Sequence, residues 1–271
     1  MKRLIAIEWQ QLWNARYFRI LIALWLLAFL AVPVGFKLLL NYAETHWPEL
    51  GAMGLSPAQL PLFDFREIWQ NLAYVYKMFS ILFSFIVVIS ITNDLDYKTQ
   101  RQHVIDGMSR KEWLLSKWYT ILAGTTISAL MVFVVTLISG MCFSYSFTAQ
   151  EVFETVGFIG AYWIHMFLFL QLAGLLAMVI RRSGITIAVM IFWIYVFEPI
   201  SVSIVRYEMK ISWLSNIFPF EASWRLIPDV FPHLLMQPGN DQVPLDALLI
   251  AGAYLAVIMS FAWWWLRRKD L

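Results

Sequence analysis

Charged residues are scarce in this sequence. They make up 14% of its 271 residues, and hydrophobic residues make up 61%, whereas about a quarter of a typical soluble domain is charged. This shortage excludes an ordinary soluble protein, because too few charged side chains are present to cover its surface. The composition predicts a polytopic membrane protein.

Motifs of several kinds of site are also missing. No Gly-x-x-x-x-Gly-Lys-Ser/Thr phosphate loop occurs, so we expect no ATP hydrolysis, no enzyme activity and no cofactor in this chain. There is no His-Glu-x-x-His or Cys-x-x-Cys motif, and no metal site is predicted. The single cysteine, Cys142, excludes an intramolecular disulfide. Because the basic residues are spread along the membrane boundary, no nucleic-acid partner is expected.

Apolar runs dominate what remains. Six windows are long enough to cross a hydrocarbon core of about 30 Å, which takes roughly 20 helical residues. They cover residues 18–40, 74–92, 119–147, 157–180, 185–205 and 245–266. The predicted fold class is therefore all-α, with six transmembrane helices in a single domain over residues 1–271.

Lysine and arginine are divided unevenly by these spans. Fourteen lie on the side of both termini and six on the other side. Basic residues are retained on the cytoplasmic side of a membrane. Both termini are therefore expected in the cytoplasm.

The segments outside the spans carry patterns of their own. Residues 1–17 mix tryptophans with basic and apolar residues at helical spacing, which predicts an interfacial helix. Asp64 and Glu67 predict a helix start near Asp64. The short connection 181–184 predicts a tight helical hairpin. Residues 206–244 are rich in aromatics and prolines, which predicts broken or re-entrant helices before the sixth span, or else a loop lying on the membrane.

The longest polar, cationic segment is residues 93–117, between the second and third spans. Residues 100–106 can form about two helical turns ending at Gly107, a residue suited to closing a helix. Ser109 and Glu112 then have the spacing of a capping box for a second helix. The alternative is a solvated loop that only obeys the positive-inside rule.

This segment resembles the corresponding loop of ABC-2 type permeases, the membrane subunits of ATP-binding-cassette exporters. The matching positions are the acidic Asp94 and Asp96, Thr99-x-Arg101, Gly107-Met108-Ser109-Arg110, Leu114 and Lys117. The six-span layout is similar over the full length. Two departures occur: aspartates stand where glutamate is usual, and Gly107-Met108 stands where proline is common.

The resemblance implies a partner. In this family the loop is a coupling helix that docks on a separate ATPase subunit, which binds ATP and Mg. It also implies a second permease subunit, identical or related. The expected substrate of export is hydrophobic or amphipathic, such as a peptide, an antibiotic or a lipid-like molecule. The expected location is the bacterial plasma (inner) membrane, where membrane lipids surround the protein. The residues expected to dock are Arg101, Val104, Ile105, Gly107, Met108, Ser109, Arg110 and Glu112.

Polar groups within the spans are costly at membrane depth and are candidates for function. His165, Gln171 and Glu198 form a possible intramembrane pathway. A lone histidine among aromatic residues, such as His165, is more often a hydrogen-bonded packing residue. Glu198 precedes Pro199, and this pair predicts a break in the fifth span. Lys77 is expected to extend outward to water.

Two other classes of function stay open. A membrane-embedded enzyme acting on lipid or prenyl substrates would need clustered carboxylates or histidines, and Asp94 with Asp96 is the nearest pair. A scaffold or sensor subunit would use the same docking loop while nothing crosses the membrane.

Overall fold

The structure, a computed structural model, describes residues 9–10, 12–47, 61–96, 109–144, 148, 151–229 and 242–268. This part of the chain is helical and contains no strand. Five helices are long and apolar enough to cross a membrane, or six if one bent pair counts as a span. The predicted class of an all-α, multi-pass membrane protein is confirmed. The orientation of the termini stays a prediction.

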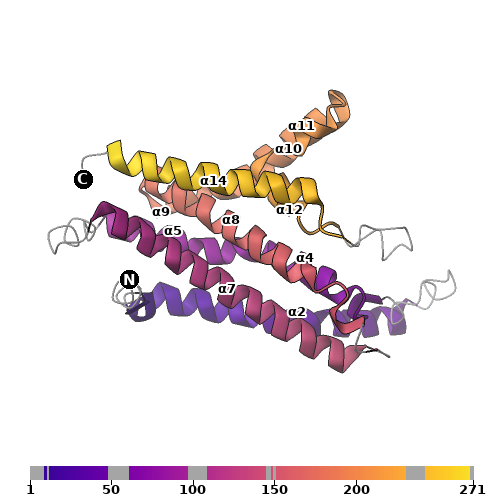
Figure 1. Ribbon diagram of the computed structural model, residues 1–271. Helices are drawn as coiled ribbons and strands as arrows, with labels where there is room; N and C mark the ends of the chain where they lie inside the picture. The colour runs from indigo at the N-terminus through magenta and orange to yellow at the C-terminus, as the bar shows by residue number, and fades with distance from the viewer. Residues whose placement is uncertain are drawn as a thin grey trace.

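The long helices lie side by side in a bundle (Figure 1). In chain order they are α2 (Arg16–His46), α4 (Ile68–Met78) with α5 (Ser80–Asp96), α7 (Arg110–Phe143), α8 (Gly157–Ile180), α9 (Ser183–Phe192) and α14 (Leu245–Arg268). The third helix covers its predicted window up to Phe143, and residues 145–147 lie outside the described part. Among the described residues, all six windows are helical except at Phe79, between α4 and α5, and at Ser144, which follows the end of α7.

Shorter elements connect these helices. A π-helical turn η4 (Trp193–Phe197), α10 (Glu198–Ser203) and a second π-helical turn η5 (Ile204–Glu208) extend α9. Two short helices follow, α11 (Ser212–Ser215) and α12 (Pro219–Trp224), and single 3₁₀ turns η2 (Pro61–Phe63) and η3 (Glu151–Phe153) precede α4 and α8. The predicted broken helices before the last span are present, although their depth in a membrane stays a prediction.

Helix α8 is the centre of the bundle. In its most apolar stretch 56% of the residues are buried, against 17% in α2 and 22% in α14. A helix that is apolar on all sides is suited to such a position, whereas the outer helices leave leucines exposed to lipid. Gly174 allows close packing here, since a Cβ atom at this position would lie 3.2 Å from Ile91 Cδ1 of α5. The core therefore forms around α8.

The second span is broken. Helices α4 and α5 meet at Phe79 with a bend of 42°. No proline lies at the break; the Ser80 hydroxyl donates a hydrogen bond to the carbonyl of Lys77 and competes with the regular helical pattern. Helix α4 begins at Ile68. The turn of residues 65–67 before it already contains an α-helical hydrogen bond, from Ile68 N to Asp64 O at 2.7 Å, so the helical path starts at Asp64.

The fifth span differs from its prediction. Arg181 adopts a left-handed conformation (φ 61°) that ends α8, and α9 begins at Ser183, so the predicted hairpin is confirmed. The predicted break at Glu198 and Pro199 is wrong, because the helical path continues from Ser183 to Glu208. The π-helical turn η4 pairs Glu198 N with Trp193 O just before Pro199, where the ring removes a backbone donor.

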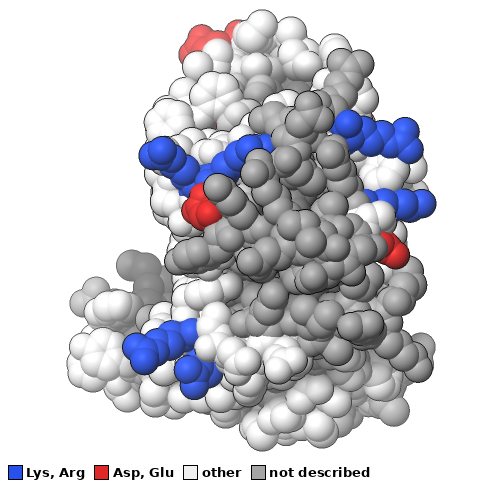
Figure 2. Space-filling view, turned by 90° about the vertical axis from the view of Figure 1, so that its left-hand side faces the viewer, with Lys and Arg blue, Asp and Glu red and all other residues white. Residues whose placement is uncertain are grey.

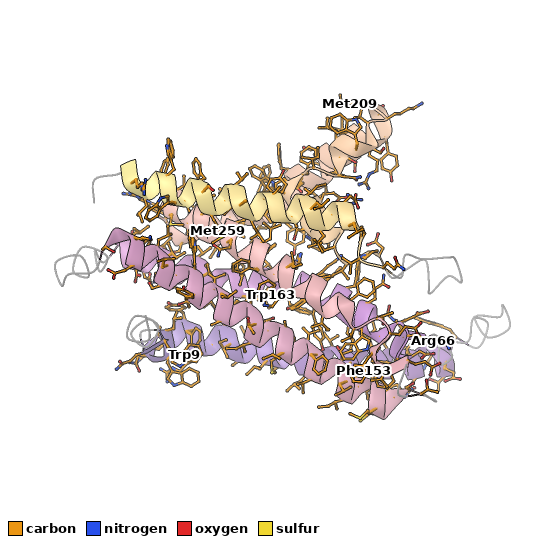
Figure 3. All side chains as sticks on the ribbon, in the orientation of Figure 1. Trp9, Arg66, Phe153, Trp163, Met209 and Met259 are labelled. Atoms are coloured by element: carbon orange, nitrogen blue, oxygen red, sulfur yellow. The ribbon has the colours of Figure 1, made fainter. Side chains whose placement is uncertain are left out.

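The two ends of the bundle carry different groups. Helices α2 and α7 begin at one end, where α14 finishes (Figure 1). Figure 2 looks onto this end, and most of the charged side chains drawn there are Lys and Arg. Trp9 lies at the same end, and Arg66 and Phe153 lie at the opposite one (Figure 3). Residues 9–10 and 12–14 are helical, in agreement with part of the predicted N-terminal helix.

Candidate functional site

The predicted docking loop is described only at its end. Arg101, Val104, Ile105, Gly107 and Met108 lie outside the described residues, as does the side chain of Arg110. The capping box at the start of α7 is confirmed. Ser109 Oγ accepts from Glu112 N at 3.2 Å, and Ser109 N donates to Glu112 Oε2 at 2.7 Å. Arg110 is the first residue of the helix that this box begins.

A buried ion pair joins the two helices that flank this loop. Lys117 Nζ of α7 lies 2.6 Å from Asp94 Oδ2 of α5, and the two side chains are 3% and 10% exposed. Trp113 Nε1 donates to the same Asp94 oxygen at 3.4 Å. Two charges removed from water are costly unless they face each other, and here they do. The pair fixes the end of α5 against the first turns of α7.

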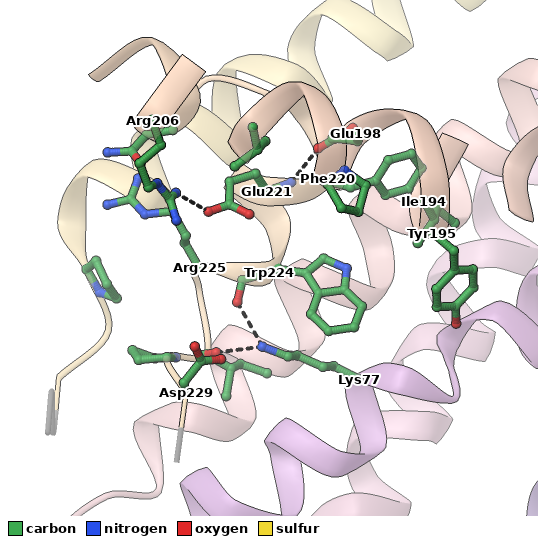
Figure 4. A pocket seen from close by; sticks show the side chains of 16 residues that line it. Lys77, Ile194, Tyr195, Glu198, Arg206, Phe220, Glu221, Trp224, Arg225 and Asp229 are labelled. Carbon is green, nitrogen blue, oxygen red and sulfur yellow. Dashed lines mark hydrogen bonds and ion pairs between the residues drawn. The ribbon is translucent and has the colours of Figure 1, made fainter. Parts of the chain in front are cut away.

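A cavity of about 680 Å³ lies near the opposite end of the bundle (Figure 4). Its walls come from α4, from the fifth span and from the segment around α12. We call it the α12 cavity. Its charged lining residues are three bases and three acids: Lys77, Arg206, Arg225, Glu198, Glu221 and Asp229.

Lys77 is held inside this wall. The prediction that it extends to water is wrong: it is 1% exposed, and Nζ donates to the carbonyls of Trp224 at 3.0 Å and Ile227 at 2.7 Å. The ammonium also lies 4.0 Å from the ring centre of Tyr74 and 4.8 Å from that of Trp224. Carbonyl oxygens and aromatic faces both favour a cation, so they compensate part of its desolvation.

Glu198 lies in the opposite part of the wall and is 2% exposed. Its carboxylate accepts from Trp193 Nε1 at 2.8 Å and from Glu221 N at 2.6 Å. These donors are neutral groups. The fifth span supplies Glu198 and Trp193 on successive turns, and α12 supplies the backbone N–H of Glu221 near its N-terminal end.

His165 connects three elements beneath the cavity. Its Nε2 lies 3.1 Å from Ser80 Oγ at the break in the second span, and its Nδ1 lies 2.6 Å from Ser223 Oγ of α12. The ring is fully buried in α8. This geometry favours the hydrogen-bonded packing role. His165 therefore holds α12 over the start of α5.

The three predicted pathway residues do not form one site. Glu198 lines the α12 cavity, His165 lies beside it, and Gln171 is about 9 Å further along α8, at about 1.5 Å per residue. Gln171 is buried, and its Nε2 has no hydrogen-bond partner among the described atoms. Arg206, Glu221 and Arg225 also line the cavity and were not predicted from the sequence. Their position in a mostly apolar outer segment is the signal that could have identified them.

Among the described residues, no group of three or more His, Cys, Asp and Glu side chains could hold a metal ion. Residues 56–271, most of the chain, match a family described as protein of unknown function (DUF2705). A comparison with curated proteins found no significant match.

Proposed function

The chain belongs to the family of proteins of unknown function DUF2705, and because that description assigns no activity, we propose from its residues that it is the permease subunit of an ATP-binding-cassette exporter. A separate ATPase subunit would hydrolyse ATP and dock on residues 97–113. A second permease, identical or related, would complete the pathway in the bacterial plasma membrane.

The observation that carries this proposal is the Asp94–Lys117 pair. It lies where the helices flanking the loop meet, and both of its residues belong to the pattern that resembles ABC-2 permeases. The capping box of Ser109 and Glu112 stiffens the loop's exit into α7. A push on the loop would therefore move α5 and α7 together instead of bending either one. Helix α5 packs on α8, so the movement would reach the centre of the bundle.

ATP binding would act by favouring one of two packings of these helices. Such a shift requires the ATPase to bind the two states with different affinity. Asp94 is held by Lys117 and Trp113 while Asp96 is exposed, which supports a structural role for Asp94 over the alternative of a lipid or prenyl enzyme that uses both carboxylates.

The test is co-purification from the native membrane in mild detergent, with the attached proteins identified by mass spectrometry. The wild-type chain is expected to bring a stoichiometric ATP-binding-cassette subunit. Arg110→Glu is expected to lose it. Arg182→Glu is the matched control, because it makes the same charge change in the α8–α9 hairpin and is expected to retain the subunit.

A second variant tests coupling. Gly107→Pro is expected to uncouple ATP hydrolysis from transport while the chain still folds. Isolation of the wild-type chain without any ATPase would overturn the proposal, as would unchanged coupling in both loop variants.

A further inference from the structure

The α12 cavity is lined by charges that differ in how they are compensated. Arg206 Nη2 makes an ion pair of 2.5 Å with Glu221 Oε1. Arg225 Nη2 makes one of 2.6 Å with Asp246 Oδ2 of α14. A ligand that approached either arginine would have to displace a carboxylate that is already in place. The arginines therefore form the frame of the cavity.

Lys77 and Glu198 are compensated differently. Neither has an oppositely charged side chain within ion-pair distance among the described residues, and Asp229 and Glu221 attract Lys77 only from further away. Their partners are carbonyls, aromatic rings, an indole N–H and backbone N–H groups. A buried charge without a counter-charge is costly in a protein interior and more so at membrane depth.

Both groups keep capacity for a ligand. An ammonium has three N–H donors, and the two carbonyl partners of Lys77 among the described residues leave one donor for a ligand anion. A carboxylate has about four acceptor positions, and Trp193 Nε1 with the backbone N–H groups of Glu221 and Phe220 leaves one of them for a cationic N–H. Figure 4 shows the two side chains on either side of the Trp224 ring, with Asp229 near Lys77, so Lys77 and Glu198 together offer one charge of each sign.

Apolar side chains also line the cavity. Ile194, Tyr195, Val202, Phe220 and Ile227 line the cavity together with Trp224. Its volume of about 680 Å³ falls within the range of about 300–1,000 Å³ typical of sites for small molecules. Lys77 lies in the last turn of α4, about 13 Å along the helix from Ile68 at about 1.5 Å per residue.

We propose that the α12 cavity binds a zwitterionic amphiphile, with its ammonium group at Glu198, its anionic group at Lys77 and its apolar body against Trp224 and Phe220. The identification of this amphiphile as the exported substrate rests on the proposed function. The existence of the binding site does not depend on it. Two sources share this chemistry, a short apolar peptide with free termini and a phospholipid with an ethanolamine head group.

The experiment is isothermal titration calorimetry with the full chain in an uncharged detergent. The lipid series is dihexanoyl phosphatidylethanolamine with two controls, dihexanoyl phosphatidylglycerol, which is only anionic, and uncharged dihexanoylglycerol. The peptide series is Leu-Phe with its N-acetyl form, which is only anionic, and its C-terminal amide, which is only cationic. The zwitterion of one series is expected to bind at least ten-fold more tightly than its controls, and that series identifies the source.

Two variants assign the charges. Glu198→Gln keeps the shape and can still accept from Glu221 N; it is expected to lower the affinity for the zwitterion at least ten-fold, to that of the anionic control, which itself stays unchanged. Lys77→Met is expected to weaken both. If Lys77→Met does not fold, the proposal is tested by Glu198→Gln alone, through its selective loss of affinity for the zwitterion. Glu208→Gln and Lys37→Met are the matched controls outside the cavity and should bind as wild type.

Equal binding of the zwitterions and their controls would overturn the proposal, as would no binding in either series or equal losses in Glu198→Gln and Glu208→Gln. These outcomes leave the ATPase co-purification untouched. Conversely, a missing ATPase with intact zwitterion selectivity would overturn the exporter and keep the binding site.

Discussion

Buried charges lie at both ends of the bundle, and they are arranged in different ways. At one end Asp94 and Lys117 face each other at 2.6 Å, with Trp113 as an additional donor. At the other, Lys77 and Glu198 line a cavity, and their hydrogen-bond partners among the described residues are neutral groups. Opposite charges in direct contact compensate each other's desolvation, whereas charges apart remain able to attract a third molecule.

The difference indicates two roles: the Asp94–Lys117 pair connects two helices, whereas Lys77 and Glu198 can bind a ligand. The Asp94–Lys117 pair uses its electrostatic attraction to connect α5 with α7. The α12 cavity uses its arginine ion pairs for that purpose, through Arg206 with Glu221 and Arg225 with Asp246, and leaves Lys77 and Glu198 without an ion pair among the described residues. Substitutions should therefore change stability most at the first end and ligand binding most at the second.

The largest effect on stability is expected for Asp94→Ala. It leaves Lys117 buried without a counter-charge, which should lower the free energy of unfolding by about 3–5 kcal/mol. The double variant Asp94→Leu with Lys117→Met should return close to the wild-type value, because it removes both charges. SDS titration of the detergent-solubilised protein, followed by circular dichroism, measures this. Asp96→Ala changes an exposed aspartate nearby and should have no measurable effect; an equal loss there would contradict the comparison.

A smaller effect is expected in the α12 cavity. Lys77→Met removes the donor for the carbonyls of Trp224 and Ile227, and leaving buried acceptors unpaired should cost about 1–3 kcal/mol. Glu198→Gln can keep the hydrogen bond from Glu221 N, but its amide nitrogen cannot accept from Trp193 Nε1, so one buried donor is left unpaired and the variant should cost about 1–3 kcal/mol. The same SDS titration applies. A loss for Glu198→Gln as large as that for Asp94→Ala would mean that the cavity charge is structural.

The smallest effect is expected at the capping box. Ser109→Ala removes the side-chain acceptor for Glu112 N and should cost about 1 kcal/mol, the usual contribution of an N-cap. Thermal unfolding followed by circular dichroism measures it. Ser183→Ala is the control, because Ser183 lies at the start of α9, where no side-chain cap bond forms. Similar shifts in both variants would show that the cap does not contribute.

The spans were predictable because each depends on local sequence. Within a membrane a helix must satisfy its own backbone groups, so a long apolar run leaves few other structures open. The capping box of Ser109 and Glu112 and the turn at Arg181 are local in the same sense, and both were predicted correctly. Residue type and spacing over a few positions carry all the necessary information there.

The environment of Lys77 was not predictable in this way. The carbonyls that bind it come from Trp224 and Ile227, 147 and 150 residues further along the chain. A rule for isolated helices sends a lysine outward, and only tertiary contacts reverse that. The break at Pro199 was predicted wrongly for a related reason. The π-helical turn before Pro199 accommodates its missing backbone donor, and no simple residue pattern predicts such a turn.

The two π-helical turns also set the phase of the fifth span. A regular helix rotates by about 100° per residue, so each extra residue accommodated in a π turn shifts everything beyond it by that angle. Arg206 lies within the second of these turns, opposite Glu221. Removing one residue from η4 would restore ordinary winding and point Arg206 elsewhere, with no change in hydrophobicity. The number of residues in η4 therefore determines the direction of Arg206 as much as the choice of side chains does.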